Sequence, residues 1–203
     1  MASSINASTS GPGGVITTAD NSGILNLQSG GNTVATINSS GLQVTTLNSS
    51  TVPTAAGTVM VSGNMPAFSV YYNSTMSLTA GTNTKVNFNI KEFDTANCYD
   101  NTTNYRFTPN VAGYYCFTGS MGVTTTTGTC IIAFYKNGSI YKYGGAIASS
   151  STSYPFSVGT VIVYMNGTTD YMELYVQSTV AGASSWSGAS ANNYFQGFMV
   201  RAA

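Results

Sequence analysis

Apolar and polar residues alternate with a period of two over most of residues 67–203, as in strands that bury one face. No segment of helical length carries a 3.6-residue period, and Gly- and Asn-rich turn signals separate the alternating segments. The segments that we expect to form strands are AFSVYYN, TKVNFNI, NYRFTPN, GYYCFTGSMGV, TCIIAFYKNG, SIYKYGGAI, YPFSVGTVIVYM, YMELYVQST and NYFQGFMVRA. The pattern therefore predicts an all-β domain, a sandwich or jelly roll.

Residues 1–50 show a sparser pattern, with few apolar residues in each short segment. Apolar groups such as Val15–Ile16 and Val34–Ile37 are separated by turn signals, which predicts short strands. Strands with so few apolar residues cannot bury enough surface to be stable alone. We therefore expect an N-terminal β-rich segment for attachment or trimerisation, stabilised by copies of itself or by a larger partner. The alternative is a flexible linker, which the Ser, Gly and Asn content also allows.

The boundary between these two regions is marked by breakers of regular structure. Pro53, Gly57 and Pro66 fall between the last N-terminal apolar group and the first long alternating segment. We therefore expect a linker over residues 51–66, followed by a jelly-roll head domain over residues 67–203.

Charged residues are scarce: they make up 6% of the chain, and the formal net charge is zero. No basic patch is available to neutralise phosphates, so we do not expect nucleic-acid binding. Fourteen Tyr and nine Phe argue against disorder. The chain has no run of eighteen apolar residues, so we expect no membrane insertion. The N-terminal sequence MASSINASTSGPGG lacks the basic and apolar regions of a secretory signal, so we expect synthesis in the cytoplasm without a signal peptide.

The residue types needed for most catalysis are absent or poorly placed. The chain contains no His, which excludes Ser-His-Asp and Cys-His arrangements. A glycosidase-like carboxylate pair would have to come from Glu92, Asp94, Asp100, Asp170 and Glu173. Glu92, Asp94 and Asp100 could form a calcium site, and Glu92 and Asp94 would share a face of an extended strand, but the spacing of a calcium loop is missing. The alternative is that they are solvated loop charges beside Lys85, Lys91 and Arg106. We expect no catalytic residue, no metal and no cofactor, and hence no enzyme.

The three cysteines, Cys98, Cys116 and Cys130, are widely spaced. This spacing is not typical of a disulfide framework or a zinc site. We expect the three cysteines to be small, buried side chains that behave as apolar residues. Whether two of them form a disulfide depends on which strands are neighbours, so that possibility stays open.

Three aromatic residues are candidates for ligand-binding loops. Trp186, the single tryptophan, lies among small residues, and Tyr141 and Tyr143 follow the Asn137–Gly138 turn signal. Aromatic residues in such loops often anchor ligands or partner proteins. The alternative for Trp186 is that it folds back onto the core.

The stretch Tyr105–Phe117, YRFTPNVAGYYCF, joins a strand, a turn and an aromatic-rich strand. Pro109 has no N–H and a fixed φ, which suits a turn or a strand end. We expect Gly113 to let the backbone reverse. In the second strand, Tyr115 and Phe117 should share one face because side chains alternate along a strand.

This stretch belongs to an ordered set of motifs along the C-terminal region. The set comprises Phe88–Asn89, Asp100, Phe107, Pro109, Gly113, Tyr115, Phe117, Lys136–Asn137–Gly138, Asn166–Gly167 with Asp170, and finally Phe195, Gly197 and Phe198. It resembles the globular head of complement component 1q and the related tumour necrosis factor (TNF) jelly roll, although Thr168 and Thr169 separate the usual Gly-Asp pair. The resemblance implies a homotrimeric jelly-roll head with aromatic-lined interfaces and a recognition role. Candidates for its core or trimer interface are Tyr115, Phe117, Phe195 and Phe198.

The N-terminal run Ile37–Leu42 resembles segments of tailed-phage fibre and decoration proteins. Together these features favour a non-enzymatic virion structural protein, a homotrimeric fibre or spike at a tail-fibre tip or on the capsid, whose head projects and adheres to the host surface. Its expected partners are its own copies, other virion proteins through the N-terminal segment, and a host surface glycan or receptor. The alternative hypothesis is a cellular or secreted recognition module of the same fold that binds a protein or glycan.

Overall fold

The computed structural model describes residues 3–7, 15–18, 22–44, 46–47, 50–51, 65–124, 127–149, 155–185 and 191–203. The chain divides into two compact units, Met1–Gly57 and Thr58–Ala203. This division falls within the segment that Pro53, Gly57 and Pro66 mark in the sequence. No helix that could cross a membrane occurs in the described residues.

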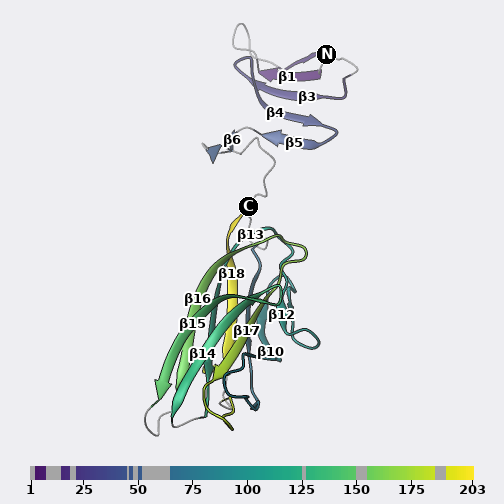
Figure 1. Ribbon diagram of the computed structural model, residues 1–203. Helices are drawn as coiled ribbons and strands as arrows, with labels where there is room; N and C mark the ends of the chain where they lie inside the picture. The colour runs from purple at the N-terminus through teal and green to yellow at the C-terminus, as the bar shows by residue number, and fades with distance from the viewer. Residues whose placement is uncertain are drawn as a thin grey trace. The chain divides into compact units, whose positions relative to one another are not determined.

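The N-terminal unit contains one five-stranded sheet in the order β2-β1-β3-β4-β5 (Figure 1). The strands of this unit are β1 (Ser3–Ala7), β2 (Val15–Thr18), β3 (Leu25–Ser29), β4 (Asn32–Asn38), β5 (Gly41–Val44) and the paired β6 (Thr46–Leu47) and β7 (Ser50–Thr51). β1 is parallel to β3, and the other neighbours in the sheet are antiparallel. The other strand pairing among the described residues of the unit is the two-stranded β6–β7.

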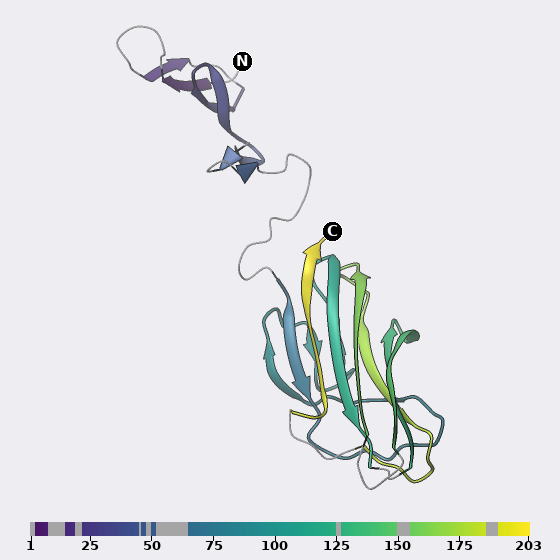
Figure 2. The ribbon, with the colours of Figure 1, turned by 90° about the vertical axis from the view of Figure 1, so that its left-hand side faces the viewer.

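The C-terminal unit, the head, contains two antiparallel sheets whose long strands run along its length (Figures 1 and 2). The first sheet has the order β10-β8-β18-β13-β16, and the second has the order β11-β12-β17-β14-β15 with β9 beside β17. The strands are β8 (Ala67–Tyr71), β9 (Thr84–Lys85), β10 (Ile90–Asp94), β11 (Tyr99–Asp100), β12 (Arg106–Phe107), β13 (Gly113–Gly122), β14 (Gly128–Lys136), β15 (Ser139–Ser149), β16 (Phe156–Met165), β17 (Met172–Ser178) and β18 (Tyr194–Ala202). Most neighbours are distant in sequence, and the first strand, β8, pairs with the last, β18. The described residues thus form the predicted all-β jelly roll.

Aromatic side chains from both sheets meet in the core between them. Phe117 and Phe195, on neighbouring strands of the first sheet, stack with ring centroids 5.7 Å apart, and Phe107 from the second sheet lies 5.5 Å from Phe117. Phe68 stacks on Phe107 at 4.5 Å. All four side chains are almost completely buried. Their contacts across the two sheets hold the sandwich together.

The stretch Tyr105–Phe117 forms β12, a turn and the start of β13. Tyr115 and Phe117 are fully buried, whereas Tyr114 is exposed on the opposite face, as the alternation predicts. The role expected for Gly113 was wrong, because Gly113 is not among the positive-φ residues. A Cβ atom at Gly113 would lie 2.3 Å from the carbonyl oxygen of Arg201 in β18, so the close approach of that strand is what requires glycine.

Two turn signals of the sequence are joined by one carboxylate. Asn137 and Gly138 have φ of 53° and 77° and connect β14 to β15, as expected for a two-residue hairpin. The Asp170 carboxylate accepts hydrogen bonds from the Asn137 side chain at 2.8 Å and the Asn166 backbone N–H at 3.0 Å. It also pairs with Lys136 at 2.9 Å. Burial alone would raise the pKa of Asp170, but these partners lower it overall.

One predicted strand is much shorter than its pattern suggests. Of the segment TKVNFNI, only Thr84–Lys85 and the first residue of β10 belong to strands. Val86 and Phe88 are nevertheless fully buried, so the alternation identified the side chains that enter the core. The Val86 backbone N–H still donates to the carbonyl oxygen of Leu174 in β17 at 3.0 Å, one position beyond β9.

Candidate functional sites: an apolar sheet face and a polar cavity

The outward side of the first sheet of the head is unusually apolar. Its exposed large apolar side chains, which we call the apolar face, are Phe93, Tyr114, Val158, Ile162, Tyr164, Phe198 and Val200. The register places Ile162 of β16 and Phe198 of β18 on either side of Cys116 in β13. Ile162 is 56% exposed and Phe198 is 53% exposed, so two large side chains flank a central strand in contact with solvent.

The middle of the apolar face is hollowed by a cavity of about 240 Å³. Residues from four strands, β8, β10, β13 and β18, line it, among them Phe93, Cys116 and Phe198. The outward positions of β13 and β16 carry no charged side chain. A contiguous apolar surface of this kind usually marks a protein–protein contact.

β16 shows a sequence signal for this face that the strand prediction did not use. The segment VIVYM has apolar residues at successive positions, which is typical of a strand covered on both sides. Val161 and Val163 point into the core, and Ile162 and Tyr164 are exposed. A strand with both faces apolar and only one covered needs a further layer, and the sequence alone could have indicated this.

The edge of the sandwich beside β16 is formed by β15. Tyr141 and Tyr143 lie within this strand and not in a loop, so the loop placement was wrong. Both belong to the β14–β15 hairpin, which continues well past the Asn137–Gly138 turn. Tyr143 is 56% exposed, whereas the Tyr141 hydroxyl donates a hydrogen bond to the carbonyl oxygen of Ile162 at 3.1 Å.

The other candidate residues fall into two groups. Tyr115, Phe117 and Phe195 are fully buried in the core, and Phe198 lies on the apolar face. Trp186 lies outside the described residues.

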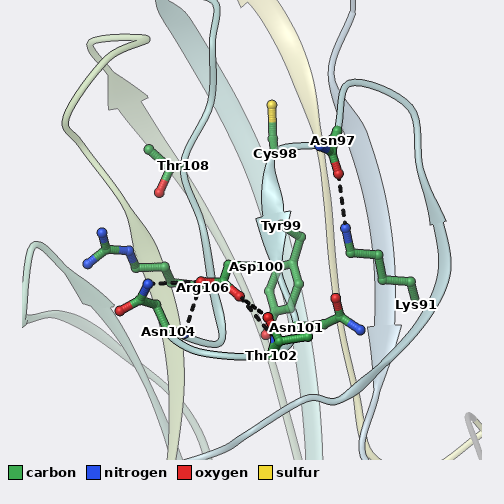
Figure 3. A pocket seen from close by; sticks show the side chains of 10 residues that line it. All are labelled: Lys91, Asn97, Cys98, Tyr99, Asp100, Asn101, Thr102, Asn104, Arg106 and Thr108. Atoms are coloured by element: carbon green, nitrogen blue, oxygen red, sulfur yellow. Dashed lines mark hydrogen bonds between the residues drawn. The ribbon is translucent and has the colours of Figure 1, made fainter.

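A second cavity, of about 410 Å³, lies beside β10, β11 and β12 (Figure 3). We call it the polar cavity; its lining residues are Lys91, Asn97, Cys98, Tyr99, Asp100, Asn101, Thr102, Asn104, Arg106 and Thr108. Figure 3 shows Lys91 and Asn97 along one side and Asp100, Asn104 and Arg106 gathered at one end. The spacing of these residues along the chain does not indicate a shared site, although the polar run after Asp100 signals a side-chain-capped turn.

Asp100 holds the loop at the end of the polar cavity. Its carboxylate accepts hydrogen bonds from the backbone N–H groups of Thr102, Thr103 and Asn104, each at 3.0 Å. The Asn104 side-chain amide donates a further bond at 2.8 Å. The backbone bonds from Thr103 and Thr102 hold the pKa of Asp100 well below its ordinary value.

The three carboxylates considered for calcium have separate structural partners. Asp94 accepts the backbone N–H groups of Cys98 and Tyr99 and pairs with Lys91 at 2.9 Å. Glu92 accepts a hydrogen bond from the Ser69 hydroxyl at 2.7 Å. A β-bulge between Lys91 and Phe93 interrupts the alternation that would have placed Glu92 and Asp94 on one face. No group of three potential metal ligands occurs among the described residues.

All three cysteines are free thiols. Cys98 and Cys130 are buried, and Cys116 is partly buried on the apolar face. Burial raises the pKa of the Cys130 thiol to about 12, so this thiol stays protonated and unreactive at neutral pH.

No protein-family model and no curated protein matches the chain. Among solved structures, murine APRIL at pH 5.0 matches with a TM-score of 0.52 and 9% identity over 67% of this chain and 99% of that chain. Eiger TNF from S. frugiperda matches with a TM-score of 0.51 and 10% identity over 68% of this chain and 93% of its own. PRD1 vertex protein P5 has a TM-score of 0.49 and 17% identity, over 67% of this chain and 97% of its own. At such identities a likeness shows the fold alone, and the first two confirm the TNF-like jelly roll.

Proposed function

We propose that this chain is a non-enzymatic structural protein of a tailed-phage virion, a homotrimeric fibre or spike. Its jelly-roll head projects from the particle and adheres to the host surface, and its N-terminal sheet attaches it to other virion proteins. The apolar face of the head is the observation that carries this proposal. Three of the ion pairs in the head, Lys85–Glu173, Lys91–Asp94 and Lys136–Asp170, join loops and strands of one copy, which suits a structural role.

The apolar face explains why the head should not remain a monomer. Burying a large apolar side chain such as Phe198 or Ile162 is worth about 1.5–3 kcal/mol. A cyclic trimer joins two different patches at each interface, one from each neighbouring copy. The apolar face and the exposed side chains of β15, including Ile140 and Tyr143, supply two such patches on one chain.

The N-terminal sheet supports the same assembly because apolar side chains of β3, β4 and β5 lie on one of its faces. Leu25 and Leu27 of β3 are paired with Ile37 and Ala35 of β4, and Ile37 is paired with Leu42 of β5. Paired residues lie on the same face of a sheet, so these apolar side chains form one stripe. Leu42 is 62% exposed. Such a stripe is stable when other copies or a virion partner cover it.

The assembly is tested by placing a charge on the apolar face. We expect Phe198→Glu to convert the trimer into folded monomers, because burying an unpaired carboxylate in an interface is costly. The control, Thr103→Glu, adds the same charge at an exposed position of the β11–β12 loop and should leave the trimer intact. Sedimentation velocity gives the mass, and circular dichroism reports the fold. A trimer that survives Phe198→Glu contradicts the proposed interface.

Virion membership is tested by immunogold labelling of intact particles with an antibody to the head. Labelling at the tail tip or on the capsid is the expected result. Labelling of cells and not of particles contradicts the virion role and favours the recognition-module alternative.

A further inference from the structure

We propose that the polar cavity beside β10, β11 and β12 is a binding site for an uncharged sugar unit. This inference rests on the adhesive role proposed above and names the site and the ligand class. It does not depend on the trimer, since the lining of the polar cavity shares no residue with the apolar face.

The size and lining of the cavity suit a small hydroxyl-rich ligand. Its volume of about 410 Å³ lies within the usual range for small-molecule sites, about 300–1,000 Å³. Most such sites are lined by apolar side chains. This one is lined mainly by amides, hydroxyls and charged groups, so it fits a ligand that is polar over most of its surface.

The groups left over after internal bonding include both donors and acceptors. The side-chain amides of Asn101 and Asn104 donate within the protein, to the Asn89 carbonyl and the Asp100 carboxylate. Their amide oxygens, and the Thr108 hydroxyl, have no partner in the described part of the chain. Sugar hydroxyls both donate and accept, so they complement such a mixed set better than a purely accepting anion does.

Tyr99 also borders the cavity, but it does not add to this set of groups. Its ring packs on Phe68 and Phe195 in the core, and its hydroxyl is buried away from solvent. The ligand contacts are therefore left to the amides, the Thr108 hydroxyl and Arg106.

The charges of the cavity do not favour an acidic ligand. Lys91 is already paired with Asp94 at 2.9 Å. Arg106 lies over the Tyr171 ring at 4.1 Å and forms no ion pair with a described residue. The ionised Asp100 at the same end repels anions, and this leaves Arg106 to donate hydrogen bonds to neutral oxygens.

The walls of the cavity are held in place before any ligand binds. The bonds from the backbone of the loop to Asp100 fix one end. The Lys85 ammonium donates to the carbonyl oxygen of Asn104, which fixes the same loop to β9. A preorganised site loses less conformational entropy on binding than a mobile loop does.

Saturation-transfer-difference NMR on the full chain tests the site with glucose, galactose, mannose, N-acetylglucosamine and N-acetylgalactosamine as neutral probes. Glucuronic acid and N-acetylneuraminic acid are the acidic comparisons. Thr108→Val removes one lining hydroxyl at nearly constant shape, and Arg106→Gln removes the unpaired donor group. The matched control is Thr103→Val, which removes an exposed hydroxyl outside the lining of the same loop. Amide NMR spectra of each variant verify the fold.

We expect at least one neutral sugar to bind, about tenfold more weakly to Thr108→Val and to Arg106→Gln, and equally to Thr103→Val. Three results overturn the proposal: no neutral sugar binds, only the acidic sugars bind, or Thr108→Val and Arg106→Gln both bind as well as the control. Sedimentation of the same samples reports the trimer. Failure of sugar binding in an intact trimer therefore rejects this site alone, whereas a monomer that binds sugar rejects only the proposed assembly.

Discussion

The head and the N-terminal sheet are both built from β-strands that are mostly antiparallel, yet among the described residues only the head has a core. Twenty-three buried apolar residues form one cluster in the head, while Ala35 is the only buried apolar residue among the described side chains of the N-terminal unit. The difference follows from the second layer. Two sheets can bury facing side chains such as Phe107 and Phe117 against each other, whereas a single sheet leaves one apolar stripe uncovered. A strand-rich sequence therefore indicates an independent fold only where enough apolar residues occur for two layers.

The largest expected effect comes from separating the two units. A fragment of residues 58–203 should fold cooperatively because it keeps the whole aromatic core, and a fragment of residues 1–57 should be unfolded when it is isolated. Circular dichroism and amide NMR dispersion of the two fragments measure this. A stably folded monomeric fragment of residues 1–57 would contradict the comparison.

Truncating one apolar side chain in each unit sharpens the comparison between the head and the N-terminal sheet. Phe195→Ala should destabilise the head by about 3–5 kcal/mol, because it leaves a cavity among five aromatic rings. Ile37→Ala should cost under about 1 kcal/mol in a monomeric sample, because Ile37 is exposed on the uncovered stripe. Urea denaturation, followed by far-UV circular dichroism, gives the loss of unfolding free energy for both variants. Similar losses at the two sites would mean that the N-terminal sheet is covered.

Glycines test the packing density of the two units. A Cβ atom at Gly159 in β16 would lie 2.6 Å from the Cα of Gly144 in β15, where the two sheets meet at the sandwich edge. Gly159→Ala should therefore cost about 1–3 kcal/mol. Gly31 in the N-terminal unit has nothing within 4 Å and a φ of +81°, so Gly31→Asn should be tolerated, because Asn adopts such backbone angles more readily than most residues. Thermal unfolding of both variants provides the measurement, and a harmless Gly159→Ala would show that the strands can separate.

The smallest effect concerns the side chains that cap turns. Asp100 accepts several hydrogen bonds, whereas the Asn38 side chain of the N-terminal unit accepts one, from the Ser40 backbone N–H at 2.8 Å. Asp100→Ala should cost about 1–2 kcal/mol, and Asn38→Ala less. Because the pKa of Asp100 is lowered on folding, its contribution is fully present above about pH 4 and is lost as the pH falls towards the folded-state pKa. The difference between wild type and Asp100→Ala should shrink with acidification, and a constant difference would contradict the role of the carboxylate.

Much of the fold was visible in the sequence because its signals are local. The burial of Tyr115 and Phe117 follows from a period of two, and the turn at Asn137–Gly138 follows from the preference of these residues for positive φ. The reason for Gly113 was not visible, because it depends on Arg201 at the far end of the chain.

The candidate sites were less accessible to sequence reasoning for the same reason. The polar cavity combines Lys91 of β10 with Arg106 of β12, and Arg106 is positioned by Tyr171, which precedes β17. Such a site depends on strand order and not on spacing. The apolar face was partly readable, because β16 has apolar residues on both of its faces.

The central claim is that the apolar face is covered by other copies of this chain. Sedimentation equilibrium of the full chain across a range of concentrations tests it most directly. We predict a single species of three times the chain mass of 21.1 kDa. A mass of one chain at concentrations where the head is folded would contradict the claim.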